Sequence, residues 1–140
     1  MVIDAFGFFE TDAEHDAVLT ESSRVLKTGG RLALKVVNGE RLLYGFRDFD
    51  REERDGAVIT ISRTLQLNPL RVTETIRVDG PRGAGGYERR QRLFRADDLR
   101  ATLERAGFLV EGVFASPDGM PFDAGTSPSM WFVGQRSTKQ

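Results

Sequence analysis

The stretch that decides the fold is residues 6–38, FGFFETDAEHDAVLTESSRVLKTGGRLALKVVN. Thr11 and Glu14 lie three residues apart in the pattern of a capping box, which predicts the start of a helix. Apolar residues then recur at helical spacing, and these are Ala17, Val18, Val25 and Leu26. Gly29 predicts the end of the helix, and residues 31–38 alternate as a β-rich strand. A helix that leads directly into such a strand predicts half of an α/β unit.

The middle of the chain predicts an antiparallel β-meander over residues 57–94. Residues 57–67, 71–78 and 87–94 each alternate with a period of two, and short turn-like links join them. The glycine-rich link, residues 80–86, lies between two strand-like segments and opens no helix. We therefore interpret it as a hairpin tip rather than as a phosphate-binding loop, which needs a strand–turn–helix context.

The remaining segments complete a single predicted domain over residues 1–140. Residues 39–56 predict a surface helix or loop with a solvated run of charges at residues 50–55. Residues 95–106 predict a second helix, because acidic residues lie in its first turn and a glycine follows its end. Residues 109–115 and 130–135 predict two further strands. Strands that mix with helices in this order predict an α/β protein.

The composition excludes several classes of function. The formal net charge of −1 gives no electrostatic support for nucleic-acid binding. The chain has no cysteine and one histidine, so we expect no disulfide and no cysteine-based or multi-histidine metal site. No apolar run approaches the ~20 residues that cross a bilayer, and we expect a cytoplasmic protein. His15 lies in the first turn of a predicted helix, where we expect it to be exposed or to assist the cap rather than to act as a base.

Three stretches of the sequence resemble a known family. FGFF, a capped helix and then RVLKTGGRLALKVVN resemble the segment around the fourth and fifth strands of class I S-adenosylmethionine (SAM)-dependent methyltransferases. That family usually has a serine where Ala5 stands and a proline where Thr28 stands. LRATLERAGF resembles the helix before the family's sixth strand. The last segment is similar to the family's ending, with Ser129 where arginine is common, so the resemblance runs from Phe6 to Arg136.

The resemblance implies a particular fold. The chain would be the C-terminal part of a Rossmann-like methyltransferase sheet, with three strands and two main helices. Residues 57–94 would be an inserted antiparallel meander that covers the substrate side. The family's strand order implies that residues 130–135 lie between residues 31–38 and 109–115 and run antiparallel to both.

The resemblance also implies a function, which is SAM-dependent methyl transfer to a small molecule by the C-terminal part of an enzyme. The family's glycine-rich cofactor loop would precede Met1, as in a cloned fragment, a mis-started gene or one half of a split enzyme. We therefore expect the isolated chain to bind SAM weakly or not at all and to be inactive. The alternative is a non-catalytic binding or dimerisation module derived from a methyltransferase.

Site residues follow from the same resemblance. Asp4 and Phe6 are expected to contact the cofactor and Phe9 the substrate, because they follow the carboxyl end of the family's fourth strand, where ligands bind in open α/β sheets. Arg89 and Arg90 are expected to contact an anionic substrate. The alternative for them is a row of solvent-facing or cross-strand-paired arginines. No catalytic residue is identified, because methyl transfer depends largely on alignment of the two reactants.

The expected assembly is a homodimer or a complex with an N-terminal half-domain partner. Without its usual neighbour, the strand at residues 31–38 would expose one edge, and an exposed apolar edge is a template for pairing with another chain. Apolar residues near the N-terminus would also lose the surface that they normally pack against, and these are Val2, Ile3, Phe6, Phe8 and Phe9. An apolar patch of that kind usually marks an interface.

Overall fold

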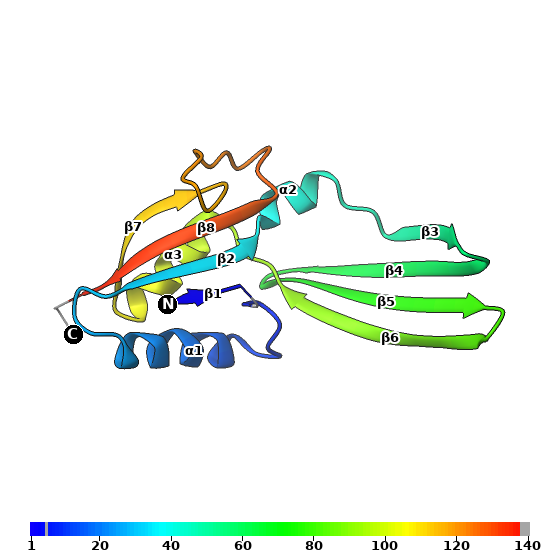
Figure 1. Cartoon of the computed structure of the whole chain (residues 1–140), viewed down its shortest axis with the longest axis horizontal. Helices are drawn as coiled ribbons and strands as arrows, with labels where there is room; N and C mark the ends of the chain where they lie inside the picture. The colour runs from blue at the N-terminus through cyan, green and yellow to red at the C-terminus, as the bar shows by residue number, and fades with distance from the viewer. Residues whose placement is uncertain (5, 138–140) are drawn as a thin grey trace. The chain divides into compact units, whose positions relative to one another are not determined.

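The computed structural model describes residues 1–4 and 6–137 and divides the chain into two compact units (Figure 1). The first unit contains the residues up to Tyr44 together with those from Leu93 onward, and the second is Gly45–Arg92. The sequence analysis predicted one domain over residues 1–140. Because the two units have separate sheets, each is described by itself.

The first unit is built on a four-stranded sheet in the order β1-β2-β8-β7. Its strands are β1 (Val2–Ile3), β2 (Arg31–Val37), β7 (Phe108–Phe114) and β8 (Ser129–Arg136). β8 pairs antiparallel with both β2 and β7, as the family's strand order implied. β1 pairs parallel with β2 at two positions, Ala33 and Leu34, so the edge that β2 was expected to expose is covered in part, and β1 is the edge strand.

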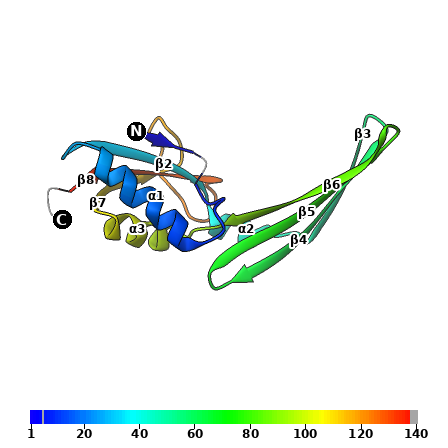
Figure 2. The same ribbon diagram turned by 90° about the horizontal axis from the view of Figure 1, so that it is seen from below.

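Helices α1 (Asp12–Val25) and α3 (Ala96–Arg105) pack on one face of this sheet, and a short helix α2 (Gly39–Tyr44) follows β2 (Figure 2). The hydroxyl of Thr11 accepts a hydrogen bond from the backbone N–H of Glu14 at 3.2 Å, which confirms the predicted start of α1. The other half of the capping box is altered, because the Glu14 carboxylate accepts from the Thr11 hydroxyl instead of from its backbone.

The face that α1 buries differs from the predicted one. Its buried residues are His15, Leu19 and Ser22, whereas Val25 is 53% exposed. Beyond the helix, Gly29 has a φ of +82°, which confirms the expected turn in a region that favours glycine. This turn brings the chain into β2, where Leu32, Leu34 and Val36 alternate toward the helices.

The core of the first unit lies between the sheet and the two long helices. It consists of Phe6, Leu19, Leu32, Leu34, Val36, Phe94, Leu99, Leu103, Phe108, Met130 and Phe132. Burial of each such side chain contributes about 1.5–3 kcal/mol relative to leaving it in water. The opposite face of the sheet carries half-buried residues, among them Lys35, whose ammonium lies 5.7 Å from the centre of the Trp131 ring.

The second unit is a four-stranded antiparallel meander in the order β3-β4-β5-β6. Its strands are β3 (Phe49–Arg54), β4 (Ala57–Leu67), β5 (Leu70–Gly80) and β6 (Gly83–Arg92). The predicted three-stranded meander over residues 57–94 therefore lacked its first strand. The predicted hairpin tip at residues 80–86 is shorter than expected, because β5 and β6 extend as far as Gly80 and Gly83.

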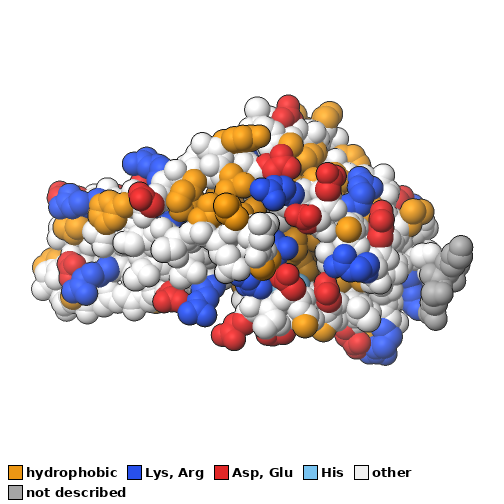
Figure 3. All heavy atoms as spheres, turned by 180° about the vertical axis from the view of Figure 1, so that it is seen from behind, with side chains coloured by type: hydrophobic (Ala, Val, Ile, Leu, Met, Phe, Trp, Pro, Cys, Tyr) orange, Lys and Arg blue, Asp and Glu red, His pale blue; other side chains and the backbone are white. Residues whose placement is uncertain are grey.

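The charge run at residues 50–54 lies in strand β3 rather than in the predicted surface helix or loop, and Asp55 lies in the turn that follows. Arg51 bonds Glu53 at 2.9 Å and Arg54 bonds Glu52 at 2.6 Å, so each face of the strand carries a pair of opposite charges. Residues two apart share a face of a strand, which is why this charge spacing suits a solvent-exposed edge. In the face drawn in Figure 3, basic and acidic side chains are interspersed over the surface.

Candidate functional site

The parallel strands β1 and β2 end at the same edge of the first sheet, and the candidate site lies there. Ligands in open α/β sheets bind beyond the carboxyl ends of parallel strands. The chain leaves β1 into residues 6–9, here called the 6–9 loop, and leaves β2 at Asn38. Asn38 forms an isolated parallel bridge with Phe94, which brings a third segment to this edge.

An aromatic cluster holds the 6–9 loop against α1. The ring of His15 lies 5.0 Å from that of Phe6 and 5.2 Å from that of Phe9, both in edge-on geometry. Phe94 stacks on Phe6 at 5.5 Å and meets the His15 ring at 6.0 Å. Such aromatic pairs contribute about 0.5–1.5 kcal/mol each beyond the area that they bury. The loop is therefore packed on the protein rather than open to solvent on all sides.

His15 occupies the centre of this cluster and is only 1% exposed. The expectation that it would be exposed or assist the cap is therefore wrong. The backbone N–H of Phe9 donates to its Nε2 at 3.2 Å, and its Nδ1 lies 3.9 Å from a carboxylate oxygen of Asp12. The physical reason is the helical period, because His15, Leu19 and Ser22 share the face of α1 that meets the core.

Asn38 ties the end of β2 to the loop at residues 115–128. Its side-chain amide donates to the carbonyl oxygens of Ala124 at 2.9 Å and Ser127 at 2.8 Å. Its Oδ1 accepts from the backbone N–H of Glu40 at 3.2 Å, at the start of α2. The residue is 1% exposed, so these bonds satisfy a polar group that would otherwise be costly to bury.

The structure brings the predicted residues Asp4, Phe6 and Phe9 to this edge, but with different exposures. Asp4 is exposed, and Phe9 is 39% exposed. The side chain of Phe6 is buried in the core, so a contact of Phe6 with a cofactor would involve its backbone. Gly7 follows with a φ of +109°, which turns the loop in a way that favours glycine.

Arg89 and Arg90 lie in the second unit, on opposite faces of β6. Arg90 bonds Glu88 at 2.8 Å on the exposed face. Arg89 lies directly opposite Glu74 on β5 and donates to its carboxylate from Nε at 2.9 Å. Both arginines therefore have carboxylate partners, which agrees with the cross-strand alternative for Arg89, and their contact with an anionic substrate stays a prediction.

A row of alternating charges crosses the meander at this point. Glu74 bonds Arg63 on β4 as well as Arg89 on β6, and Arg63 also donates to Asp50 on β3. Burial by itself would raise the pKa of Glu74, but the hydrogen bonds from Arg89 and Arg63 outweigh it and hold that pKa below its ordinary value. The hydrogen bond from Arg63 likewise lowers the pKa of Asp50. Both carboxylates are therefore ionised near neutral pH.

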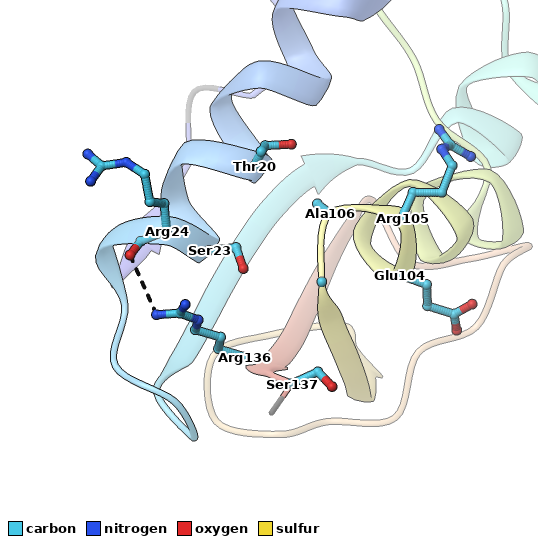
Figure 4. Close-up of a pocket in the computed structure, with 9 residues that line it drawn as sticks. Thr20, Ser23, Arg24, Glu104, Arg105, Ala106, Arg136 and Ser137 are labelled. Carbon is cyan, nitrogen blue, oxygen red and sulfur yellow. Dashed lines mark hydrogen bonds between the residues drawn. The ribbon is translucent and has the colours of Figure 1, made fainter. Parts of the chain in front are cut away.

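A hollow of about 380 Å³ in the first unit lies where α1, α3 and β8 end (Figure 4). Its lining includes Thr20, Ser23, Arg24, Glu104, Arg105, Gly107 and Arg136. Arg136 donates to the backbone carbonyls of Arg24 and Leu26. Carbonyls at the C-terminal end of a helix have no hydrogen-bond donor within the helix, so Arg136 supplies one. Arg24 pairs with Glu21, so these arginines serve the fold, and none of the predicted site residues lies here.

Sequence reasoning missed His15 and Asn38 as parts of the site. The spacing of His15, Leu19 and Ser22 on one helical face was present in the sequence and could have indicated burial of His15. The position of Asn38, directly after a buried strand, was a weaker signal, because its partners lie far along the chain. Among the described residues, no group of three or more acidic or histidine side chains is placed to hold a metal ion, and no helix is apolar and long enough to span a membrane.

Comparison with known proteins gives matches in structure alone, because no family model and no curated protein matches the sequence. A SAM-dependent methyltransferase from Clostridium acetobutylicum matches 97% of this chain with a TM-score of 0.80 and 11% identity. The CcbJ methyltransferase from Streptomyces caelestis matches 97% with a TM-score of 0.83 and 16% identity. A SAM-bound amino pentose methyltransferase from Micromonospora echinaspora matches 97% with a TM-score of 0.56 and 20% identity.

The matched region is a little over half of each of these structures. The chain covers 56% of the Clostridium chain and 58% of each of the other two. The order β1-β2-β8-β7, with β8 antiparallel between its neighbours, is the order that the sequence resemblance implied. The chain therefore has the fold of the C-terminal part of a class I SAM-dependent methyltransferase.

Proposed function

We propose that this chain is the C-terminal part of a SAM-dependent methyltransferase that acts on a small molecule. The observation that carries the proposal is the match of 97% of the chain to methyltransferases at TM-scores of 0.80 and 0.83. The candidate acceptor is an amine or hydroxyl of a sugar-like molecule, because one of the matched enzymes is an amino pentose methyltransferase. The alternative function is a binding or dimerisation module without catalysis.

The side chains at the candidate site are suitable for contacts with both the cofactor and the acceptor. Asp4 offers an exposed carboxylate, which accepts hydrogen bonds from hydroxyl or ammonium groups. Phe8 and Phe9 are 47% and 39% exposed, and the face of an aromatic ring attracts a cation such as a sulfonium. In this proposal Asp4 and the backbone of Phe6 border the cofactor and Phe9 borders the acceptor, while most contacts of the cofactor come from residues outside these 140.

The chain's own contribution to the reaction would be positioning. SAM supplies an electrophilic methyl group, so the protein needs to align the acceptor, exclude water and, for some acceptors, remove a proton. The buried cluster around His15 and the three side-chain hydrogen bonds of Asn38 hold the loops on either side of the site. Arg89 remains our candidate for an anionic group of the acceptor, because its side chain is 50% exposed although it bonds Glu74.

The side of the edge strand β1 that faces away from β2 is the proposed attachment point for the rest of the fold. β1 has only two residues and is paired on one side, by β2. Beside it, Met1 and α1 line an apolar groove of about 550 Å³ with Ala17, Val18 and Val25. We propose that an N-terminal half-domain extends the sheet here and fills the groove. A second copy of the chain on the same edge, as a twofold dimer, is the alternative.

The test compares the 140-residue chain with a polypeptide that is extended at its N-terminus by the first strands of a methyltransferase sheet. Calorimetry with SAM should show weak or absent binding to the chain alone and clear binding to the extended polypeptide. Transfer of a labelled methyl group to amino sugars should follow the same pattern. Asp4→Asn should weaken SAM binding, whereas Asp97→Asn, an exposed carboxylate on α3, is the matched control.

Two outcomes would contradict the proposal. Low-micromolar SAM binding by the 140-residue chain alone would show that the chain holds a cofactor site of its own. If the extended polypeptide neither bound SAM nor transferred a methyl group, the result would favour the non-catalytic module. Sedimentation equilibrium at low micromolar concentration decides the assembly, since a clean 15.6 kDa species would exclude a dimer of the chain.

A further inference from the structure

The imidazole of His15 is a buried, titratable group beside the candidate site. It is 1% exposed and lies among the rings of Phe6, Phe9 and Phe94. Buried polar groups in a core of this kind are retained when they hold a specific conformation, because burying them is otherwise costly. The contacts of His15 join the 6–9 loop to α1.

The direction of its hydrogen bond determines which nitrogen carries the proton. A backbone N–H can only donate, so Nε2 of His15 must accept from Phe9 with its lone pair. In the neutral ring the proton then lies on Nδ1, the nitrogen that faces the Asp12 carboxylate at 3.9 Å. The observed bond therefore requires the neutral imidazole, in one tautomer.

We propose that His15 is a positioning residue that holds the 6–9 loop at the candidate site while it is neutral and releases the loop when it is protonated. The proposal rests on the proposed function, because the loop carries Phe9 and follows Asp4. The hydrogen bond to His15 fixes the backbone of Phe9 and therefore the position of the exposed ring of that residue. A loop that is held in this way loses less conformational entropy when a ligand binds.

Protonation would act through the Nε2 atom. A second proton there removes the lone pair and places two N–H groups against each other across a distance of 3.2 Å. Among the described residues, those that face the ring include Asp12, through its carboxylate from the same helix, and the aromatic rings of Phe6, Phe9 and Phe94, from the loop and from the segment before α3. Asp12 and the rings can stabilise the charged imidazole, but neither replaces an acceptor for the Phe9 amide.

The first test is made on the chain as it exists and needs no variant. In labelled protein at pH 7.5, a through-hydrogen-bond coupling between the Phe9 nitrogen and Nε2 of His15 should be observed. Amide hydrogen exchange, corrected for its intrinsic pH dependence, should show a protected Phe9 amide at pH 7.5 that loses at least tenfold of its protection by pH 5. Absence of the coupling in the folded chain at pH 7.5 would overturn the proposal.

Two variants separate the hydrogen bond from the packing. His15→Phe keeps an aromatic ring but has no acceptor, and it should raise exchange of the Phe9 amide about tenfold while the amides around Leu19 on α1 stay protected. His15→Gln offers an amide oxygen as acceptor and should restore protection without the pH dependence. Two results would refute the proposal that His15 holds the 6–9 loop. One is an unchanged exchange rate of the Phe9 amide in His15→Phe. The other is a pH dependence of that rate in His15→Gln that equals the native one.

The link to function has its own readout. In a polypeptide that transfers methyl groups, His15→Phe should raise KM for the acceptor at pH 7.5 more than it lowers kcat, and His15→Gln should return KM toward the native value. An unchanged KM together with a mobile loop would show that the loop does not position the acceptor. If no form of the protein binds SAM, the proposed function fails, whereas the exchange measurements still decide the role of His15 in the loop.

Discussion

Replacing Asn38 by leucine should destabilise the first unit by about 4 kcal/mol. The amide of Asn38 donates to the carbonyls of Ala124 and Ser127, and its oxygen accepts from the backbone N–H of Glu40. Each such bond contributes about 1 kcal/mol net, and a buried carbonyl left without a partner costs about 1–3 kcal/mol more. Leucine has the same branching and the same number of side-chain heavy atoms as asparagine and is the larger residue, so the substitution leaves no cavity to add to this loss.

The assay for this variant is urea unfolding followed by tryptophan fluorescence. Trp131 is the single tryptophan of the chain, and it lies opposite Lys35 where β8 pairs with β2, so its emission reports on the first unit. Thr20→Leu, at an exposed position of α1 in the same unit, is the control and should change the free energy of unfolding by less than about 0.5 kcal/mol.

The result that would refute this reasoning is a loss of less than about 1 kcal/mol for Asn38→Leu with an unchanged dependence on urea. It would mean that the loop at residues 115–128 does not depend on the side chain of Asn38. A loss of the expected size should be accompanied by faster amide exchange at Ser127, whose backbone N–H donates to the carbonyl oxygen of Asp123 within that loop.

Two further predictions concern the helix cap and the charged row. Thr11→Ala should cost about 1 kcal/mol of unfolding free energy by the same fluorescence assay, because it removes the acceptor for a helical N–H, whereas Thr28→Ala outside the helix should cost little. The pKa of Glu74 is lowered from its usual 4.5, so its ionised form stabilises the meander above that pH, and this stability is lost as the pH falls through the lower, folded-state pKa. Glu74→Gln should weaken the meander at pH 7 and reduce its dependence on pH below 4.5, as measured by amide exchange, whereas Glu88→Gln on the exposed face should behave as native.

Local sequence patterns predicted most of the secondary structure correctly, because they depend on neighbouring residues. The cap at Thr11, the turn at Gly29 and the alternation in β2 each follow from a few adjacent side chains. The charge run at residues 50–55 was predicted to lie in a surface helix or loop, because a highly charged segment forms a strand only when a neighbouring strand pairs with its backbone. That neighbour is β4, which comes later in the chain.

The buried face of α1 shows why periodicity alone was insufficient. Successive residues of a helix are separated by about 100°, so Ala17, Val18 and Val25 describe an apolar stripe that is rotated by roughly 100° from the one that packs. The face that packs also contains His15 and Ser22, which are polar. The hydroxyl of Ser22 donates to the carbonyl of Val18 within the helix, so its burial leaves no polar group without a partner.

The amino-acid sequence by itself determined the helices, the strands of the first sheet and, through its resemblance to methyltransferases, the order in which those strands pair. Only the tertiary structure decided that His15 is buried, that Asn38 joins two distant loops, and that Arg89 meets Glu74 across a strand pair. The physical reason is that these contacts join residues far apart in the chain. Packing and register determine such partners, and no local pattern specifies either of them.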